Sequence, residues 1–242
     1  MPASKNRNTP QPKERSKPRI SLNKLGEYAA ESSPSRRRRI IRDQKRPKDF
    51  IVPYYDPVRD AVVSYIAKDE TDLSPLREAI EKLERAEPTS PWNKQRLQSC
   101  LDAIVAFRSQ FEAVLGREEI YAVPARKTDP ASIQINGVEV SVRPDLLVYG
   151  KDGRGKEIVG AIKLHFSKNH PLNDASGKYV ATLLHRHVEE RLAVDGLHPS
   201  RKWCLVLDIF EGERFIAPRS YKRRRANLAA ACEEIRSIWP QV

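Results

Sequence analysis

The chain has 242 residues, which is enough for one domain with extensions and a sizeable hydrophobic core. Its net charge is +12, but residues 1–48 hold 15 Lys and Arg against 4 Asp and Glu, so the rest of the chain is close to neutral. No apolar run approaches the length of a membrane span and no signal-peptide pattern is found. We therefore expect a cytoplasmic protein with no membrane partner. Three cysteines without metal-site spacing are expected to be buried free thiols: Cys100, Cys204 and Cys232.

Residues 1–48 are predicted to form a disordered basic arm, because their first 35 residues are rich in Pro, Ser, Asn and Lys. A dense cationic cluster follows, and such clusters bind polyanions by releasing counterions. A disordered tail that only aids solubility is the alternative. The candidate nucleic-acid-binding residues here are Arg36, Arg37, Arg38, Arg39 and Arg42.

Three Asp-Pro or Ser-Pro pairs predict helix starts, because proline suits the first turn of a helix. Asp56-Pro57 and Ser74-Pro75 begin two helices of a helical extension over residues 49–90. Ser90-Pro91 begins a long helix that opens a core domain, residues 91–242, and is expected to end before Gly116. Glu112 lies near the end of that helix, where its carboxylate faces either the sheet or solvent.

After this helix, the sequence of the core domain predicts a series of strands. A strand over Glu119–Val123 precedes a hairpin over Ser132–Val142, which turns at Asn-Gly, the strongest short hairpin signal. Asp145 follows this hairpin, and its side chain extends from the polar side of the alternating segment. Lys163 lies in the apolar strand Glu157–Phe166 and shares its face with His165. A lysine in such a strand needs a partner or a function, unless it extends to solvent at a sheet edge.

The remaining elements alternate between helix and strand. A helix runs from Asp174 to Gly196, a strand covers Trp203–Phe210, and a last helix opens at Lys222. This order predicts an α/β fold with a central mixed sheet flanked by helices. Further candidate nucleic-acid-binding residues are Lys168, Lys178, Arg186, Arg223 and Arg224.

Pro144-Asp145 followed by Ala161-Ile162-Lys163 resembles the motif of the PD-(D/E)xK nuclease superfamily, particularly its RecB-type members. The resemblance covers roughly residues 92–239 and implies a restriction-endonuclease-like core. It also implies that Asp145 is a catalytic residue and ligates Mg²⁺, and that Lys163 is a catalytic residue that polarises the attacking water. DNA is the substrate that such a site implies.

The sequence departs from this motif at Ala161, where the family has a second acid that ligates the metal. If another acid such as Glu112 replaces it, the protein is a Mg²⁺-dependent DNA endo- or exonuclease, with Glu112 as a further catalytic residue. If none does, the fold serves nucleic-acid binding, DNA in particular, which is the leading hypothesis. A third hypothesis is a protein-interaction subunit of a larger nucleic-acid-processing complex.

Overall fold

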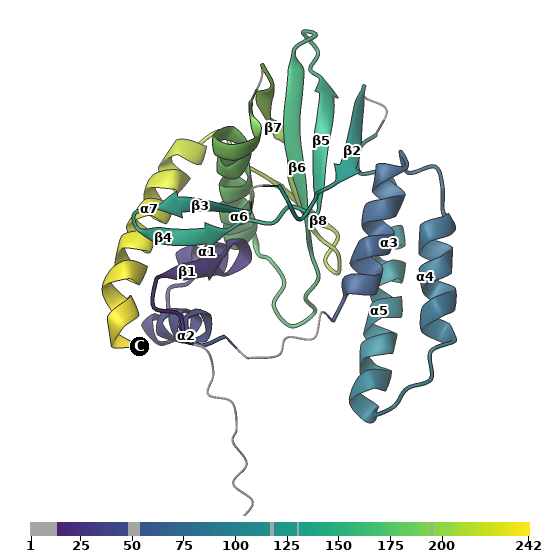
Figure 1. Ribbon diagram of the computed structural model, residues 1–242, viewed down its shortest axis with the longest axis horizontal. Coiled ribbons are helices and arrows are strands. Elements are labelled where there is room, and N and C mark those ends of the chain that lie inside the picture. Colours follow the sequence, from purple (N-terminus) through teal and green to yellow (C-terminus); the bar gives the residue numbers. More distant parts are fainter. Residues whose placement is uncertain (1–13, 48–53, 117–118, 130, 195) are drawn as a thin grey trace, which may run out of the picture.

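The computed structural model describes residues 14–47, 54–116, 119–129, 131–194 and 196–242. It has an α/β fold, as the sequence predicts, but its strands form two sheets where a single central sheet was expected (Figure 1). The larger sheet has the strand order β2-β5-β6-β7-β8 and is mixed, because β6 and β7 are parallel and every other neighbouring pair is antiparallel. Its strands are β2 (Ile120–Pro124), β5 (Leu146–Lys151), β6 (Glu157–His165), β7 (His198–Asp208) and β8 (Glu213–Ile216).

The parallel pair β6 and β7 is connected by helix α6 (Asp174–His187), as a crossover between parallel strands requires. Asn173 caps this helix in a capping box with Ser176, one residue before the predicted start. A π-helical turn, Val188–Leu192, continues α6, so the helical segment ends four residues before the predicted glycine.

The smaller sheet has the order β1-β4-β3 and contains the predicted hairpin. Its strands are β1 (Arg19–Ser21), β3 (Ser132–Ile135) and β4 (Val138–Ser141). Asn136 and Gly137 both have positive φ angles, 46° and 82°, which is the conformation of a type I′ turn. The hairpin prediction is therefore confirmed, and β1 from the N-terminal segment adds to it in parallel.

The N-terminal segment is folded, so the prediction of a disordered arm over residues 1–48 is wrong for residues 14–47. They form β1, α1 (Leu22–Ala30) and α2 (Pro34–Lys45). Apolar side chains that alternate with the cations enter the core, which composition alone does not reveal: Ile20, Leu22, Leu25, Tyr28, Ile40 and Ile41. Residues 1–13 and 48 of the predicted arm lie outside the described residues.

Gly26 brings α1 into close contact with α6. A Cβ atom at this position would lie 2.4 Å from Val180 Cγ2 and 3.1 Å from the Ser176 carbonyl oxygen. The two helices therefore approach each other as closely as they do because residue 26 has no side chain.

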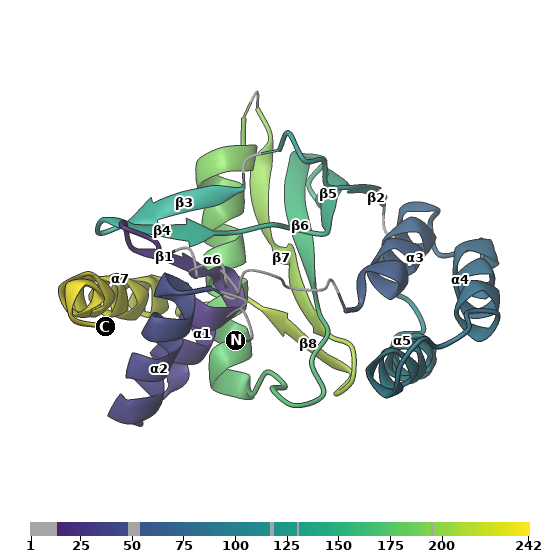
Figure 2. The same cartoon turned by 60° about the horizontal axis from the view of Figure 1, so that its bottom comes forward.

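Helices α3 (Asp56–Ala67), α4 (Ser74–Glu84) and α5 (Pro91–Gln110) pack together as a helical unit beside the larger sheet (Figure 1). One hydrophobic cluster joins this unit to the sheet face formed by residues such as Leu146, Val148 and Ile162. The opposite face packs against α6, and one hydrophobic cluster extends from there to α1, the small sheet and α7 (Tyr221–Ile238), which Figure 2 shows beyond α6. A short 3₁₀ turn, Trp239–Gln241, follows α7. In the part of the chain that the structure describes, every helix is too short or too polar to span a membrane.

Candidate functional site

Asp145 and Lys163, which the motif pairs, lie side by side in the larger sheet. Asp145 directly precedes β5, and its backbone N–H donates to the Ile162 carbonyl on β6 at 2.8 Å. The side chains share one face, with Lys163 Nζ 2.9 Å from Asp145 Oδ2. The strand periodicity predicts this juxtaposition, because both residues take the same side of neighbouring strands.

Arg59 on α3 completes the cluster and was not anticipated from the sequence. Its Nη1 donates to Asp145 Oδ1 at 2.8 Å, across 86 positions of the chain. The Leu164 backbone N–H donates to Asp145 Oδ2 at 2.7 Å. Both carboxylate oxygens of Asp145 are therefore bound by protein donors.

The cluster carries more positive than negative charge and is poorly solvated. The Asp145 side chain is 6% exposed and that of Lys163 is 13% exposed. Burial lowers the pKa of Lys163, the Asp145 carboxylate opposes that effect, and Arg59 and Arg143 add to it. One carboxylate thus faces the two cations that bind it, with a third, Arg143, nearby.

These residues do not fit a magnesium ion. Mg²⁺ binds through carboxylate oxygens, and the Asp145 carboxylate is held by two cations and a backbone N–H. Ala161, where the motif has its second acid, is fully buried between Leu147 and Cys204. Across the described ranges, no three His, Cys, Asp or Glu residues are grouped so that they could hold a metal ion.

Glu112 does not supply the missing acid. Helix α5 ends at Gln110, so the prediction that Glu112 lies on this helix is wrong. Its exposed side chain borders a surface hollow with Tyr65, Leu73 and Phe107 of the helical unit. The donors that contact the Asp145 carboxylate are those of Arg59, Lys163 and Leu164.

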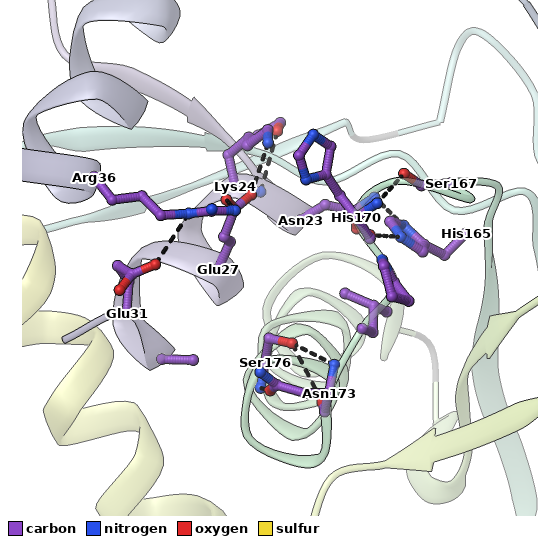
Figure 3. Close-up of a pocket in the computed structure, with 14 residues that line it drawn as sticks. Asn23, Lys24, Glu27, Glu31, Arg36, His165, Ser167, His170, Asn173 and Ser176 are labelled. Carbon is purple, nitrogen blue, oxygen red and sulfur yellow. Dashed lines mark hydrogen bonds and ion pairs between the residues drawn. The ribbon is translucent and has the colours of Figure 1, made fainter. Parts of the chain in front are cut away.

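His165, two residues after Lys163, lies against a cavity of about 440 Å³ between α1, the β6–α6 loop and the start of α6 (Figure 3). Its Nε2 lies 2.9 Å from the His170 carbonyl oxygen and its Nδ1 lies 3.2 Å from Asn23 Nδ2. A carbonyl accepts and an amide nitrogen donates, so Nε2 carries the proton and Nδ1 accepts. Burial lowers the pKa of His165, which agrees with this neutral form.

A second hollow, of about 650 Å³, adjoins this cavity and opens along α2. Its charged lining contains four cations and two carboxylates, together with His170: Lys24, Arg36, Arg39 and Arg42 against Glu27 and Asp43. We call this hollow the α2 groove. Three of the five arginines predicted to bind nucleic acid therefore line one surface. Arg38 is exposed elsewhere on α2, and Arg37 pairs with Glu234 at 3.0 Å.

Within the groove, Lys24 and Arg36 pair with Glu27, and Arg39 lies 3.9 Å from Asp43. The other predicted cations are distributed over the β6–α6 loop, α6 and α7, and most of them are paired as well. Lys168 pairs with Asp102 at 2.6 Å, Lys178 with Asp174, and Arg186 with Glu190. On α7, Arg224 lies 5.1 Å from the centre of the Tyr179 ring, whereas Arg223 is exposed. The α2 groove is thus the surface on which the predicted cations gather.

The cysteines are buried free thiols, as predicted. Burial raises the pKa of the Cys204 thiol, and it raises that of Cys232 to about 12. Burial therefore disfavours the thiolate form of both cysteines.

Comparison of the sequence with protein-family models found no match, and comparison with curated proteins found none either.

Proposed function

We propose that this protein binds nucleic acid, DNA in particular, in the α2 groove, and that it does so without a metal ion. The observation that carries this proposal is the lining of the groove, where four cations and two carboxylates surround a hollow large enough for a phosphate backbone. Cationic grooves bind nucleic acid by neutralising phosphates and releasing their counterions. The groove adjoins the His165 cavity, and His165 follows Lys163 on β6.

The order of elements supports a nuclease-like core for this binding protein. Helix α5 is followed by β2, β5, β6, α6 and β7, with Asp145 and Lys163 on neighbouring strands. In such a core a metal ion would balance the charge of the aspartate, whereas here Arg59 does so at 2.8 Å. We therefore propose binding in place of hydrolysis.

The test is DNA binding by fluorescence anisotropy over a range of salt concentrations, with EDTA and with Mg²⁺. We expect wild-type protein to bind equally well in both. Arg39→Gln/Arg42→Gln should weaken binding and reduce the salt slope by about 2, because each lost phosphate contact removes about 0.9. Lys82→Gln/Arg85→Gln removes the same charge from exposed positions at the C-terminal end of α4 and is the matched control.

Two results would overturn the proposal. Wild-type protein that binds no DNA at low salt would refute it outright, and an equal loss in the α4 control would refute the assignment to the groove. Incubation with Mg²⁺ or Mn²⁺ should leave the DNA intact. Cleavage that Asp145→Asn abolishes would replace binding with hydrolysis as the function.

A further inference from the structure

A continuous chain of aromatic rings runs from the helical unit to the ends of β6 and β7. Trp92 on α5 lies 5.9 Å from Tyr54, Tyr54 lies 4.8 Å from Tyr55, and Tyr55 stacks on Phe166 at 5.5 Å. Tyr55 also contacts Phe210, which lies in the turn between β7 and β8, at 5.8 Å. The five rings therefore form one continuous aromatic cluster that links α5 to the residues after β6 and β7.

The inner rings of this cluster are already covered on their faces. Arg59 lies 5.3 Å from the centre of the Phe166 ring, and Lys168 lies 5.2 Å from that of Phe210. Because Arg59 also holds Asp145, the ring chain connects directly to the cationic cluster at Lys163. Phe166 and Phe210 thus serve packing and position the cations.

Trp92, at the outer end, differs because half of its surface is open to solvent, at 50% exposure. Its neighbour is held in place: the Tyr54 hydroxyl donates to Ser99 Oγ at 3.3 Å, and the Tyr54 carbonyl accepts from Arg96 Nε at 3.2 Å. Trp92 is therefore one of two aromatic side chains among the exposed large hydrophobic residues that the structure describes, with Tyr121, and its flat face is available for stacking.

The charges around Trp92 favour a polyanionic partner over an apolar one. The first turn of α5 contains no acid, and Arg96 lies one helical turn after Trp92 on the same side of the helix. Lys94 is exposed as well, but it points to another side of the helix than Trp92. Further along α5, Asp102 is paired with Lys168 at 2.6 Å. Exposed aromatic rings beside cations are how proteins bind unpaired nucleotides, by stacking with the base and neutralising the phosphate.

We propose that Trp92 stacks with an unpaired base, so that the nucleic acid bound here is single-stranded where it passes the helical unit. This inference rests on the proposed nucleic-acid binding and adds the form of the ligand. A base inside a duplex shows only its edges in the grooves and cannot stack with a side chain in this way.

The test compares an oligothymidine with a duplex of the same length. Trp92→Leu should weaken binding of the single strand about tenfold and leave duplex binding unchanged, and Trp92→Phe should retain part of the affinity. Tyr121→Leu is the matched control, because Tyr121 is 53% exposed and stacks on Tyr149 at 5.8 Å on β2 and β5.

Intrinsic fluorescence gives a second readout. The other two tryptophans, Trp203 and Trp239, are 6% and 3% exposed, so quenching by the oligothymidine should come from Trp92 and vanish in Trp92→Leu. Unchanged single-strand binding and unchanged quenching in this variant would refute the inference, even where Arg39→Gln/Arg42→Gln still weakens binding and the proposed function stands. A wild-type protein that binds neither DNA refutes both.

Discussion

Arg59 on α3 and Asp145 before β5 form an ion pair of 2.8 Å that ties the helical unit to the larger sheet. The same carboxylate contacts Lys163 at 2.9 Å and the Leu164 backbone N–H at 2.7 Å. Asp145 is thus the shared acceptor of three donors from two parts of the chain. Replacing Asp145 should therefore lower the stability of the fold, whatever the function of the site.

Asp145→Asn should lower the free energy of unfolding by about 3 kcal/mol, because it leaves the poorly solvated charge of Lys163 without the carboxylate that binds it. Urea denaturation measures this. Asp43→Asn is the control, since the Arg39–Asp43 pair is 3.9 Å long with side chains 79% and 67% exposed. That change should cost less than about 0.5 kcal/mol. Equal losses in the two variants would contradict the structural role of Asp145.

Ala161→Glu, which restores the acid of the nuclease motif, should destabilise the protein because Ala161 is fully buried. Added Mg²⁺ should not restore the melting temperature, since the Arg59 guanidinium still binds the Asp145 carboxylate. In Arg59→Met/Ala161→Glu, by contrast, Mg²⁺ should raise the melting temperature, because Asp145 Oδ1 is then released from Arg59 and the introduced carboxylate supplies a second ligand. Arg59→Met/Ala161→Gln has the same shape without the charge and should not respond to Mg²⁺. A Mg²⁺ response in Ala161→Glu alone would show that Arg59 does not block the site.

Gly26→Ala should weaken the docking of the N-terminal segment, since the new Cβ would lie 2.4 Å from Val180 Cγ2. We expect a loss of about 1–3 kcal/mol in chemical denaturation. Alanine favours a helix over glycine by about 1 kcal/mol, so a net loss identifies the contact with α6 as its cause. Gly153→Ala is the control, because a Cβ there meets nothing within 4 Å. A stability gain in Gly26→Ala would mean that α1 does not pack on α6 as described.

The pH dependence of stability should include a contribution from His165. Its pKa is lowered in the folded protein, chiefly by burial, so the unfolded chain binds more protons as the pH falls below about 6.5. Stability is therefore lost as the pH falls through that value toward the folded-state pKa. Asp208 and the His170 carbonyl, which face the ring, oppose the shift, whereas Lys163 and Lys24 add to it.

Urea denaturation at pH 7.5 and pH 5 checks this. His165→Asn should lose less stability than wild type between the two values. His185, whose pKa is also lowered by burial, is present in both proteins, so its contribution cancels in the comparison. The same loss in both proteins would contradict the assignment of a neutral His165.

Local signals in the sequence predicted the elements that form from neighbouring residues. Asn136-Gly137 specified its hairpin because both residues accept positive φ angles. The proline-containing helix starts and the alternation around Asp145 and Lys163 were likewise confirmed by the structure. The N-terminal segment misled the prediction because its arginines dominate its composition, although Leu22, Leu25 and Ile41 supply an apolar side that packs in the core.

The sequence by itself thus determined the α/β class, the hairpin and the meeting of Asp145 with Lys163, since each follows from backbone preferences or strand periodicity within a short span. Only the tertiary structure decided that Arg59 binds Asp145, because that contact joins residues 86 positions apart and depends on how the helical unit packs against the sheet. Packing likewise excluded Glu112 from the site and placed one face of α2, which carries Arg36, Arg39 and Arg42, beside His170. No periodicity encodes such contacts, because they arise from side chains that meet only after separate elements have docked.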